Sequence, residues 1–320
     1  MASLSTARQK VIFILGSTAT GKSKLAINLA LLFNGEVINS DKMQVYDGLH
    51  VITNKVTPDE CAGVPHHLLG FVHPNDDFTA EDFRMAAMRV VGDIVGRGRL
   101  PIIAGGSNTY VKALVDGNGG EFAAFYDCCF IWLDVEPAVL DEFVAERVDK
   151  MVEKGLVEEA RGVFDAMNVD YSKGIRRSIG VAEMDGYLRR EKEVEREERL
   201  RLKAEAFEEI KENTWKLARE QRQKILRFVR EEGWRVRRVD ATMAIVLRGE
   251  KEVWEEVVWK PSVVIVREFL EEGRESSVVE MGVGVRRCDV AGGKDFGGGI
   301  FAGCDEWERG ERAGKMLNFV

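Results

Sequence analysis

The sequence feature that most constrains this chain is a glycine-bounded loop between an apolar run and an amphipathic segment. The loop, Gly16–Ser23, fits the pattern G-x-x-x-x-G-K-[ST]. Val11–Leu15 before it is continuously apolar, which is typical of a strand buried on both faces. After the loop, Leu25, Leu29 and Leu32 recur at helical spacing, so a helix is expected to pack back on the strand. This order of strand, loop and helix predicts a parallel α/β sheet.

The loop has the chemistry of a phosphate-binding site. Its glycines let successive N–H groups point inward, and the helix that follows adds partial positive charge at its N-terminus. Lys22 adds a full positive charge, and the hydroxyl of Ser23 can ligate Mg²⁺. The pattern alone does not distinguish the phosphates of a nucleoside triphosphate from those of another diphosphate ester. The candidate phosphate-binding residues are Gly16, Ser17, Thr18, Ala19, Thr20, Gly21, Lys22 and Ser23.

Three further runs extend the expected sheet. They are Glu36–Asn39, Leu100–Ala104 and Phe130–Leu133, with helical patterns between them. This alternation indicates a parallel sheet with helices on its faces. The expected core is therefore an α/β, P-loop NTPase-like parallel sheet flanked by helices.

Beyond the fourth strand the pattern changes. Strand signals vanish, charge rises, and residues 189–232 predict one long helix. Trp234–Val239 then alternates apolar and charged residues and predicts one returning strand. After residue 270 lie 11 of the chain's 32 glycines, too many for regular structure. The expected divisions are a P-loop α/β core over 1–136, a helical subdomain over 137–232, a return to the core over 233–270 and a Gly-rich, poorly ordered tail over 271–320.

Composition narrows the class of protein. No apolar run approaches the ~18 residues of a membrane span, and the net charge of −8 argues against a surface that grips nucleic acid. The five cysteines are odd in number and lack CxxC spacing, which suits a reducing compartment. We expect a cytoplasmic monomer, with the plastid as the alternative if an upstream transit peptide is missing. Met1–Lys10 is expected to be a frayed N-terminus.

A second chemically active position follows the second expected strand. Asp41 lies two residues after Asn39. In a parallel sheet this carboxyl end meets the phosphate loop at one edge. A carboxylate there can serve as a Mg²⁺ partner, a general base or a helix cap, and its position alone leaves these roles open.

Several motifs in order resemble the isopentenyltransferases, a family that includes the adenylate isopentenyltransferases of cytokinin synthesis and the tRNA dimethylallyltransferases. The resemblance covers roughly residues 10–270 and is greatest to the plant adenylate branch. Eukaryotic tRNA-modifying members usually carry a C-terminal Cys₂His₂ zinc finger, whereas all four histidines here lie between His50 and His73. The motifs are Gly16–Ser23, Val37–Tyr46, Val64–Leu69, Phe78–Phe83, Gly98–Tyr110 and Gly174–Gly180.

The resemblance implies a reaction and roles for particular residues. The loop would hold the diphosphate of dimethylallyl diphosphate, with Mg²⁺ at Ser23, and the prenyl group would pass to N6 of an adenine nucleotide in the first step of cytokinin biosynthesis. Asp41 is similar in position to the family's catalytic aspartate, which accepts the N6 proton. Thr18 matches a threonine that contacts the bridging oxygen, and Arg147 matches an arginine that contacts the diphosphate. The preference among ATP, ADP and AMP stays open.

The sequence does not single out the residues that hold the acceptor's phosphates. Each basic candidate is equally well explained as an ordinary charged side chain on the solvent-exposed surface. His66 and His67 are expected to be structural, hydrogen-bonding histidines. The candidates for the acceptor phosphates are Lys173, Arg176, Arg177, Lys211 and Lys216.

Other functions compete with the transfer to a free nucleotide. A tRNA dimethylallyltransferase has the same fold but needs a surface that grips an anticodon stem and a flipped base. A phosphate-loop kinase or ATPase would release or transfer phosphate without a prenyl donor. A binding module without catalysis would keep the loop and tolerate loss of Asp41. We expect two small-molecule substrates and neither a membrane nor a nucleic-acid partner.

Overall fold

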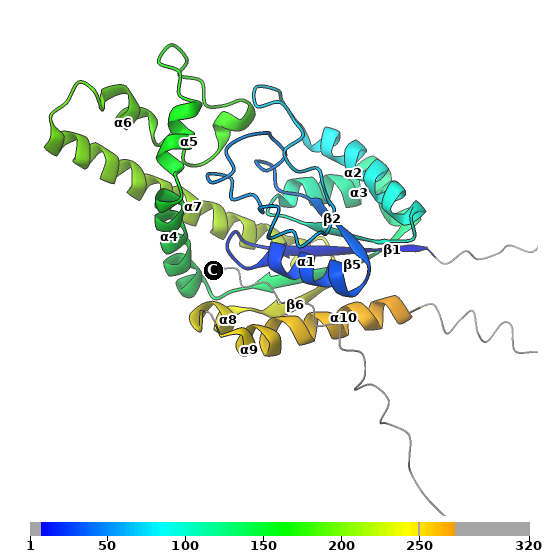
Figure 1. The fold of residues 1–320 in the computed structure, drawn as a ribbon. Helices are drawn as coiled ribbons and strands as arrows, with labels where there is room; N and C mark the ends of the chain where they lie inside the picture. Colours follow the sequence, from blue (N-terminus) through cyan, green and yellow to red (C-terminus); the bar gives the residue numbers. More distant parts are fainter. Residues whose placement is uncertain (1–7, 249, 273–320) are drawn as a thin grey trace, which may run out of the picture.

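The computed structural model describes residues 8–248 and 250–272 (Figure 1). The expected tail, from Gly273 onward, and the segment before Arg8 lie outside these ranges.

The core is a parallel sheet of six strands in the order β3-β2-β4-β1-β5-β6. All the strands that the sequence predicts are present, so the parallel α/β fold is confirmed. Only β3 was missed, because a strand of two residues has no apolar run to reveal it. The strands are β1 (Gln9–Gly16), β2 (Gly35–Asn39), β3 (His66–His67), β4 (Leu100–Ala104), β5 (Tyr126–Asp134) and β6 (Val236–Asp240).

Both faces of the sheet are covered. Along β1, Phe13 and Leu15 point into one buried cluster and Ile12 and Ile14 into the other, as the alternation of a strand requires. The first cluster includes side chains of α2 (Ala80–Gly96) and α3 (Asn108–Phe125), and the second those of α1 (Lys22–Leu32). The same second face carries α8 (Thr242–Val246), α9 (Lys251–Trp254), a π-helical turn (Glu255–Trp259) and α10 (Lys260–Glu271) (Figure 1). The sequence analysis predicted that this last stretch returns to the core but did not predict its helices.

A helical segment lies between β5 and β6 in the chain and projects from one end of the sheet (Figure 1). The predicted helix over 189–232 is shorter in the structure, where α7 begins at Arg196. A separate short helix ends at Arg190, and Glu191 directly after it pairs with Arg161 at 2.9 Å. The segment contains α4 (Pro137–Glu153), α5 (Leu156–Gly162), the 3₁₀ turn η1 (Gly174–Arg177), α6 (Asp185–Arg190) and α7 (Arg196–Arg230).

A helix that spans a membrane must be both long and apolar. None of the helices in residues 8–248 and 250–272 meets both requirements.

Replacing Phe13 by alanine tests the packing of the sheet. Phe13 is fully buried, and its ring stacks on Phe130 at a centroid distance of 4.8 Å. We expect Phe13→Ala to lower the free energy of unfolding by about 3–5 kcal/mol, measured by urea denaturation. Phe125→Ala is the matched control, since that ring is 60% exposed and its loss should change stability by less than about 0.5 kcal/mol. Equal effects of the two changes would contradict this description of the core.

Candidate active site

The candidate site lies at the carboxyl edge of the sheet. Because the strands are parallel, β1, β2, β4 and β5 all end at this edge. β1 leads into the phosphate loop, β2 into Asp41 and β4 into the turn Gly105–Gly106. Segments far apart in the sequence thus supply one site.

Two side chains of the phosphate loop form hydrogen bonds with the backbone of the same loop. Lys22 Nζ donates to the Ser17 carbonyl at 2.6 Å, and the Thr20 hydroxyl donates to the same carbonyl at 3.0 Å. Lys22 is also the first residue of α1, so the loop stands at the N-terminus of a helix. The loop therefore combines helix N–H groups with a lysine ammonium, which is the chemistry that binds phosphate.

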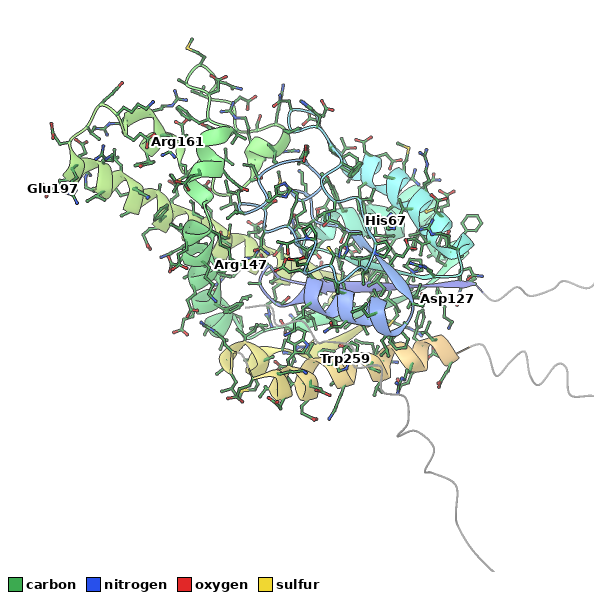
Figure 2. The ribbon with its side chains drawn as sticks, viewed as in Figure 1. His67, Asp127, Arg147, Arg161, Glu197 and Trp259 are labelled. Carbon is green, nitrogen blue, oxygen red and sulfur yellow. The ribbon has the colours of Figure 1, made fainter. Side chains whose placement is uncertain are left out.

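Three charged side chains influence one another here. Burial lowers the pKa of Lys22 to about 8, with Asp41 acting against the shift and Arg147 adding to it. Burial also lowers the pKa of Arg147, again opposed by Asp41. Arg147, labelled in Figure 2, belongs to α4. The structure thus brings together two cations and one carboxylate that the sequence analysis selected separately.

Asp41 is held by its neighbours on the loop. Its N–H donates to Asn39 Oδ1, and its Oδ1 accepts from the N–H of Met43, both at 3.0 Å. Its other oxygen, Oδ2, would lie only 3.1 Å from a Cβ at position 106, so Gly106 allows the close approach. A Cβ at Gly105 would come within 2.3 Å of the carbonyl carbon of Ser40. The backbone of Gly105 and Gly106, after β4, therefore packs directly against Asp41 and the residue before it, and this turn is called the wall of the site.

The sequence analysis missed Gln221 of α7, which joins the phosphate loop to this wall. Its Oε1 accepts from the N–H of Thr18 at 2.7 Å, and its Nε2 donates to the carbonyl of Gly106 at 3.0 Å. Its sequence position holds a signal, because it lies on the buried stripe of α7 between Ala218 and Ile225, where an apolar residue is expected.

Two further contacts with the site region were also missed. Asp134, at the end of β5, is 2% exposed and accepts from Arg222 and Arg238, each at 2.8 Å. The ring of Trp254 in α9 packs against Gly21, since a Cβ there would lie 2.5 Å from it. Neither residue belongs to a motif, so only the fold reveals these contacts.

The five candidates for the acceptor's phosphates lie in different surroundings. Arg177 donates to the hydroxyl of Tyr46 at 2.7 Å. It also lies near Lys42, whose pKa is lowered first by burial and then by Arg177. Arg176 is buried and donates to the carbonyl of Asn168 at 2.8 Å. Lys173 is exposed just before η1.

The two lysines of α7 already have acidic partners. Lys211 pairs with Asp149 at 2.9 Å and with Glu208 at 3.1 Å. Lys216 pairs with Glu212 at 2.8 Å. The structure therefore brings Arg177, but not these two, close to the residues that follow β2.

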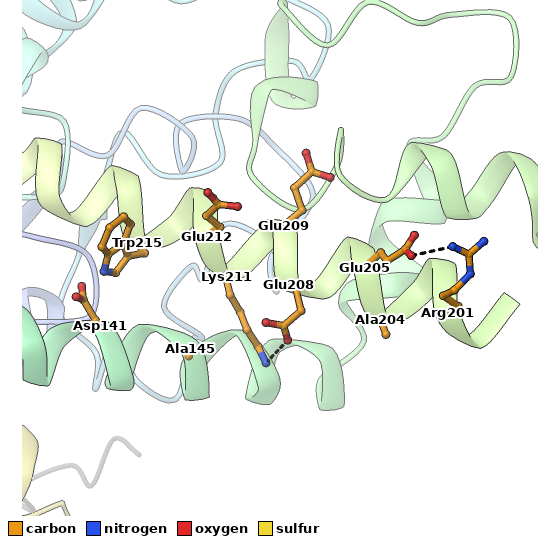
Figure 3. A pocket seen from close by; sticks show the side chains of 10 residues that line it. All are labelled: Asp141, Ala145, Arg201, Ala204, Glu205, Glu208, Glu209, Lys211, Glu212 and Trp215. Carbon is orange, nitrogen blue, oxygen red and sulfur yellow. Dashed lines mark hydrogen bonds and ion pairs between the residues drawn. The ribbon is translucent and has the colours of Figure 1, made fainter. Parts of the chain in front are cut away.

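Lys211 lines a separate groove of about 750 Å³ between α4 and α7 (Figure 3). Five carboxylates line the groove, but only two basic side chains, those of Arg201 and Lys211, do so. The groove is therefore acidic and unsuited to a phosphate. The acidic residues that line it are Asp141, Glu205, Glu208, Glu209 and Glu212.

The histidines of β3 make local contacts. His67, labelled in Figure 2, lies 2.6 Å from the buried carboxylate of Glu36, and His66 Nδ1 lies 2.9 Å from the carbonyl of Val64. Within residues 8–248 and 250–272, no group of three or more His, Cys, Asp or Glu side chains is arranged to hold a metal ion.

Comparison with known proteins places the chain in a family. The profile of the family described as IPP transferase matches residues 44–124 and 117–227. An adenylate isopentenyltransferase of Arabidopsis thaliana, designated chloroplastic, is 54% identical over 82% of this chain and 81% of its own length. An adenylate isopentenyltransferase of Humulus lupulus is 43% identical over 81% of this chain and 90% of its own length.

Solved structures show the same fold. A eukaryotic dimethylallyltransferase acting on tRNA superposes with a TM-score of 0.69 at 24% identity, covering 82% of this chain and 80% of that one. A tRNA isopentenylpyrophosphate transferase of Bacillus halodurans gives 0.63 at 27% identity, covering 83% of this chain and all of that one. With the profile match and the 54% identity, these findings show that the chain belongs to the IPP transferase family and is a prenyltransferase of the adenylate isopentenyltransferase class.

Proposed function

We propose that this chain transfers the dimethylallyl group of dimethylallyl diphosphate to N6 of an adenine nucleotide, with Asp41 as the general base. The observation that carries the proposal is the meeting of Lys22, Arg147 and Asp41 at the carboxyl edge of the sheet. The cations suit the diphosphate of the donor, and the carboxylate suits the proton that the acceptor must lose.

The donor half of the site rests on the phosphate loop. Loop N–H groups, Lys22 and Arg147 would neutralise the diphosphate, whose charge grows as its bond to carbon breaks. The Thr18 hydroxyl would donate to the bridging oxygen, where that charge develops. Both cations are half-buried, which strengthens their interaction with an anion because less water competes for them than at the open surface.

The acceptor half rests on Asp41. The exocyclic N6 amine is a poor nucleophile because its lone pair is delocalised into the adenine ring. As the new bond from N6 to carbon forms, the bond from that carbon to the diphosphate oxygen breaks and one N6 proton passes to Asp41. The contacts of Asp41 with Asn39 and Met43 would keep the carboxylate in place during this step.

Mg²⁺ fits the residues present. The Ser23 hydroxyl is exposed at the start of α1, next to Lys22, where the diphosphate would lie. Mg²⁺ commonly takes few protein ligands and completes its shell with phosphate oxygens and water, and the Ser/Thr hydroxyl of a phosphate loop is one such ligand. When bound, the ion would supply further neutralisation of the leaving diphosphate.

For the phosphates of the acceptor, Arg177 is the best supported of the five candidates. It lies near Lys42, which directly follows the proposed base. Lys173 and Arg176 remain candidates in the same segment, while Lys211 and Lys216 would first have to leave their acidic partners. ATP, ADP and AMP are all proposed acceptors.

The oligomeric state and the compartment are separate proposals. We propose a monomer. The cytoplasmic expectation stands beside the plastid, which is supported by the chloroplastic designation of the Arabidopsis relative.

Product analysis tests the proposed reaction. The protein is incubated with dimethylallyl diphosphate, Mg²⁺ and one of AMP, ADP, ATP or tRNA, and the products are identified by mass. We expect N6-prenylated nucleotide and free diphosphate. Modification of tRNA alone would favour the activity of the structural relatives, and phosphate release from ATP without the donor would favour a kinase or ATPase.

Replacing Asp41 tests the assignment of the base. We expect Asp41→Asn and Asp41→Ala to lower kcat by about 10²–10⁴ while both substrates still bind, because only the proton acceptor is lost. Asp59→Ala is the matched control, since that carboxylate is exposed on a turn. Near-normal turnover of Asp41→Ala would show that another group accepts the proton.

The low pKa of Lys22 predicts a pH dependence of donor binding. Lys22 is charged below its pKa of about 8 and loses its charge as the pH rises through this value. The Kd for dimethylallyl diphosphate, measured by calorimetry, should therefore rise as the pH is raised above 8 and level off at the value of the uncharged form. Lys22→Ala should bind weakly and lack this dependence, whereas the exposed Lys154→Ala should behave like the parent protein. A parent profile that stays flat to pH 10 would contradict the placement of the donor on Lys22.

A further inference from the structure

The side chain of Gln221 bridges two parts of the site that follow the ends of the neighbouring strands β1 and β4. One end accepts a hydrogen bond from the Thr18 N–H at 2.7 Å, and the other donates to the Gly106 carbonyl at 3.0 Å. Thr18 belongs to the donor loop after β1, and Gly106 follows β4. Beyond the last paired residues of these strands, one amide therefore links the loop to the turn.

The turn at Gly106 is also the wall of the proposed base. A Cβ at position 106 would lie 2.5 Å from Gln221 Nε2 and 3.1 Å from Asp41 Oδ2. The side-chain amide of Gln221 and the carboxylate of Asp41 thus both lie close to the backbone of Gly106. Any movement of the amide would displace the turn against which Asp41 lies.

The amide has little freedom to move. Gln221 is 6% exposed, and both polar ends of its side chain are used. Its backbone carbonyl accepts from Asn108 at 2.8 Å, and Arg222 beside it binds Asp134 at the end of β5. A buried amide that loses a partner is costly to leave unsatisfied, so the helix holds this orientation firmly.

We infer that Gln221 is a positioning residue, which fixes the distance between the Thr18 side of the donor site and the Asp41 side of the acceptor site. This inference rests on the proposed function. Gln221 need not touch either substrate, because it acts through the Thr18 N–H and the Gly106 carbonyl. Alignment of two reactants affects the chemical step far more than the binding of either one, and an error of 1 Å can cost about 10²-fold in rate.

Gln221→Met tests the role, since methionine has a similar shape and makes neither hydrogen bond. We expect kcat to fall by about 10- to 100-fold, while the KM for each substrate changes by less than about threefold. Gln221→Glu is the second variant. It keeps an acceptor for the Thr18 N–H but faces the Gly106 carbonyl with oxygen, so kcat should again fall at least about tenfold. If Gln221→Met does not fold, the kcat and KM values of Gln221→Glu are used to test the role.

Two controls on the same helix separate positioning from stability. Gln223→Met changes an exposed glutamine and should leave kcat and the melting temperature unchanged. Ile225→Val removes a buried methyl group, so it should lower the melting temperature but leave kcat within about twofold. All rates are measured well below the melting temperature of each variant.

The outcomes distinguish the inference from the proposed function. A Gln221 variant whose kcat is within twofold of Ile225→Val would overturn the positioning role, as would a loss confined to KM. Absence of prenylated nucleotide from the parent protein would instead contradict the proposed function itself. A large fall in kcat with normal KM and normal controls supports the role.

Discussion

Buried hydrogen bonds between α7 and the strand ends hold the candidate site together. The Ser17 hydroxyl donates to the Ala218 carbonyl at 2.8 Å, and Gln221 reaches both Thr18 and Gly106. Arg222 adds a pair with Asp134, which is almost completely buried. A buried polar group that loses its partner costs free energy, so these bonds together favour one docked position of α7. The docking of one helix therefore fixes the relative positions of the segments after β1, β4 and β5.

The charge of the site is opposite to that of the whole chain. The net charge is −8, yet the carboxyl edge gathers Lys22 and Arg147 around one carboxylate, and Lys42 and Arg177 near the segment after β2. The proposed donor and acceptor are both anions, so this local field favours them while acidic surroundings such as the groove between α4 and α7 do not. An acidic protein can thus bind two anionic substrates without a generally basic surface.

Much of the fold follows from local pattern. The apolar runs at Val11–Leu15 and Leu100–Ala104 are typical of buried strands, and the loop between Gly16 and Ser23 is expected between a strand and a helix. Asp41 could be selected because the carboxyl ends of parallel strands share one edge. Arg147 was selected through the family resemblance alone, since nothing in its local pattern distinguishes it. Thr18 lies within the loop pattern, but its role at the bridging oxygen also came from the resemblance.

The sequence by itself thus determined the parallel sheet, the phosphate loop and the edge at which chemistry takes place, because these depend on periodicity and on short motifs. Tertiary structure alone decided which distant side chains complete that edge. In the sequence, Gln221 stands out only as a polar residue on the apolar stripe of a charged helix, and Trp254 is an isolated aromatic residue. Their contacts with Thr18, Gly106 and Gly21 depend on how α7 and α9 pack against the sheet. Helix packing brings together residues some 200 positions apart, and no pattern within a short stretch of sequence encodes that distance.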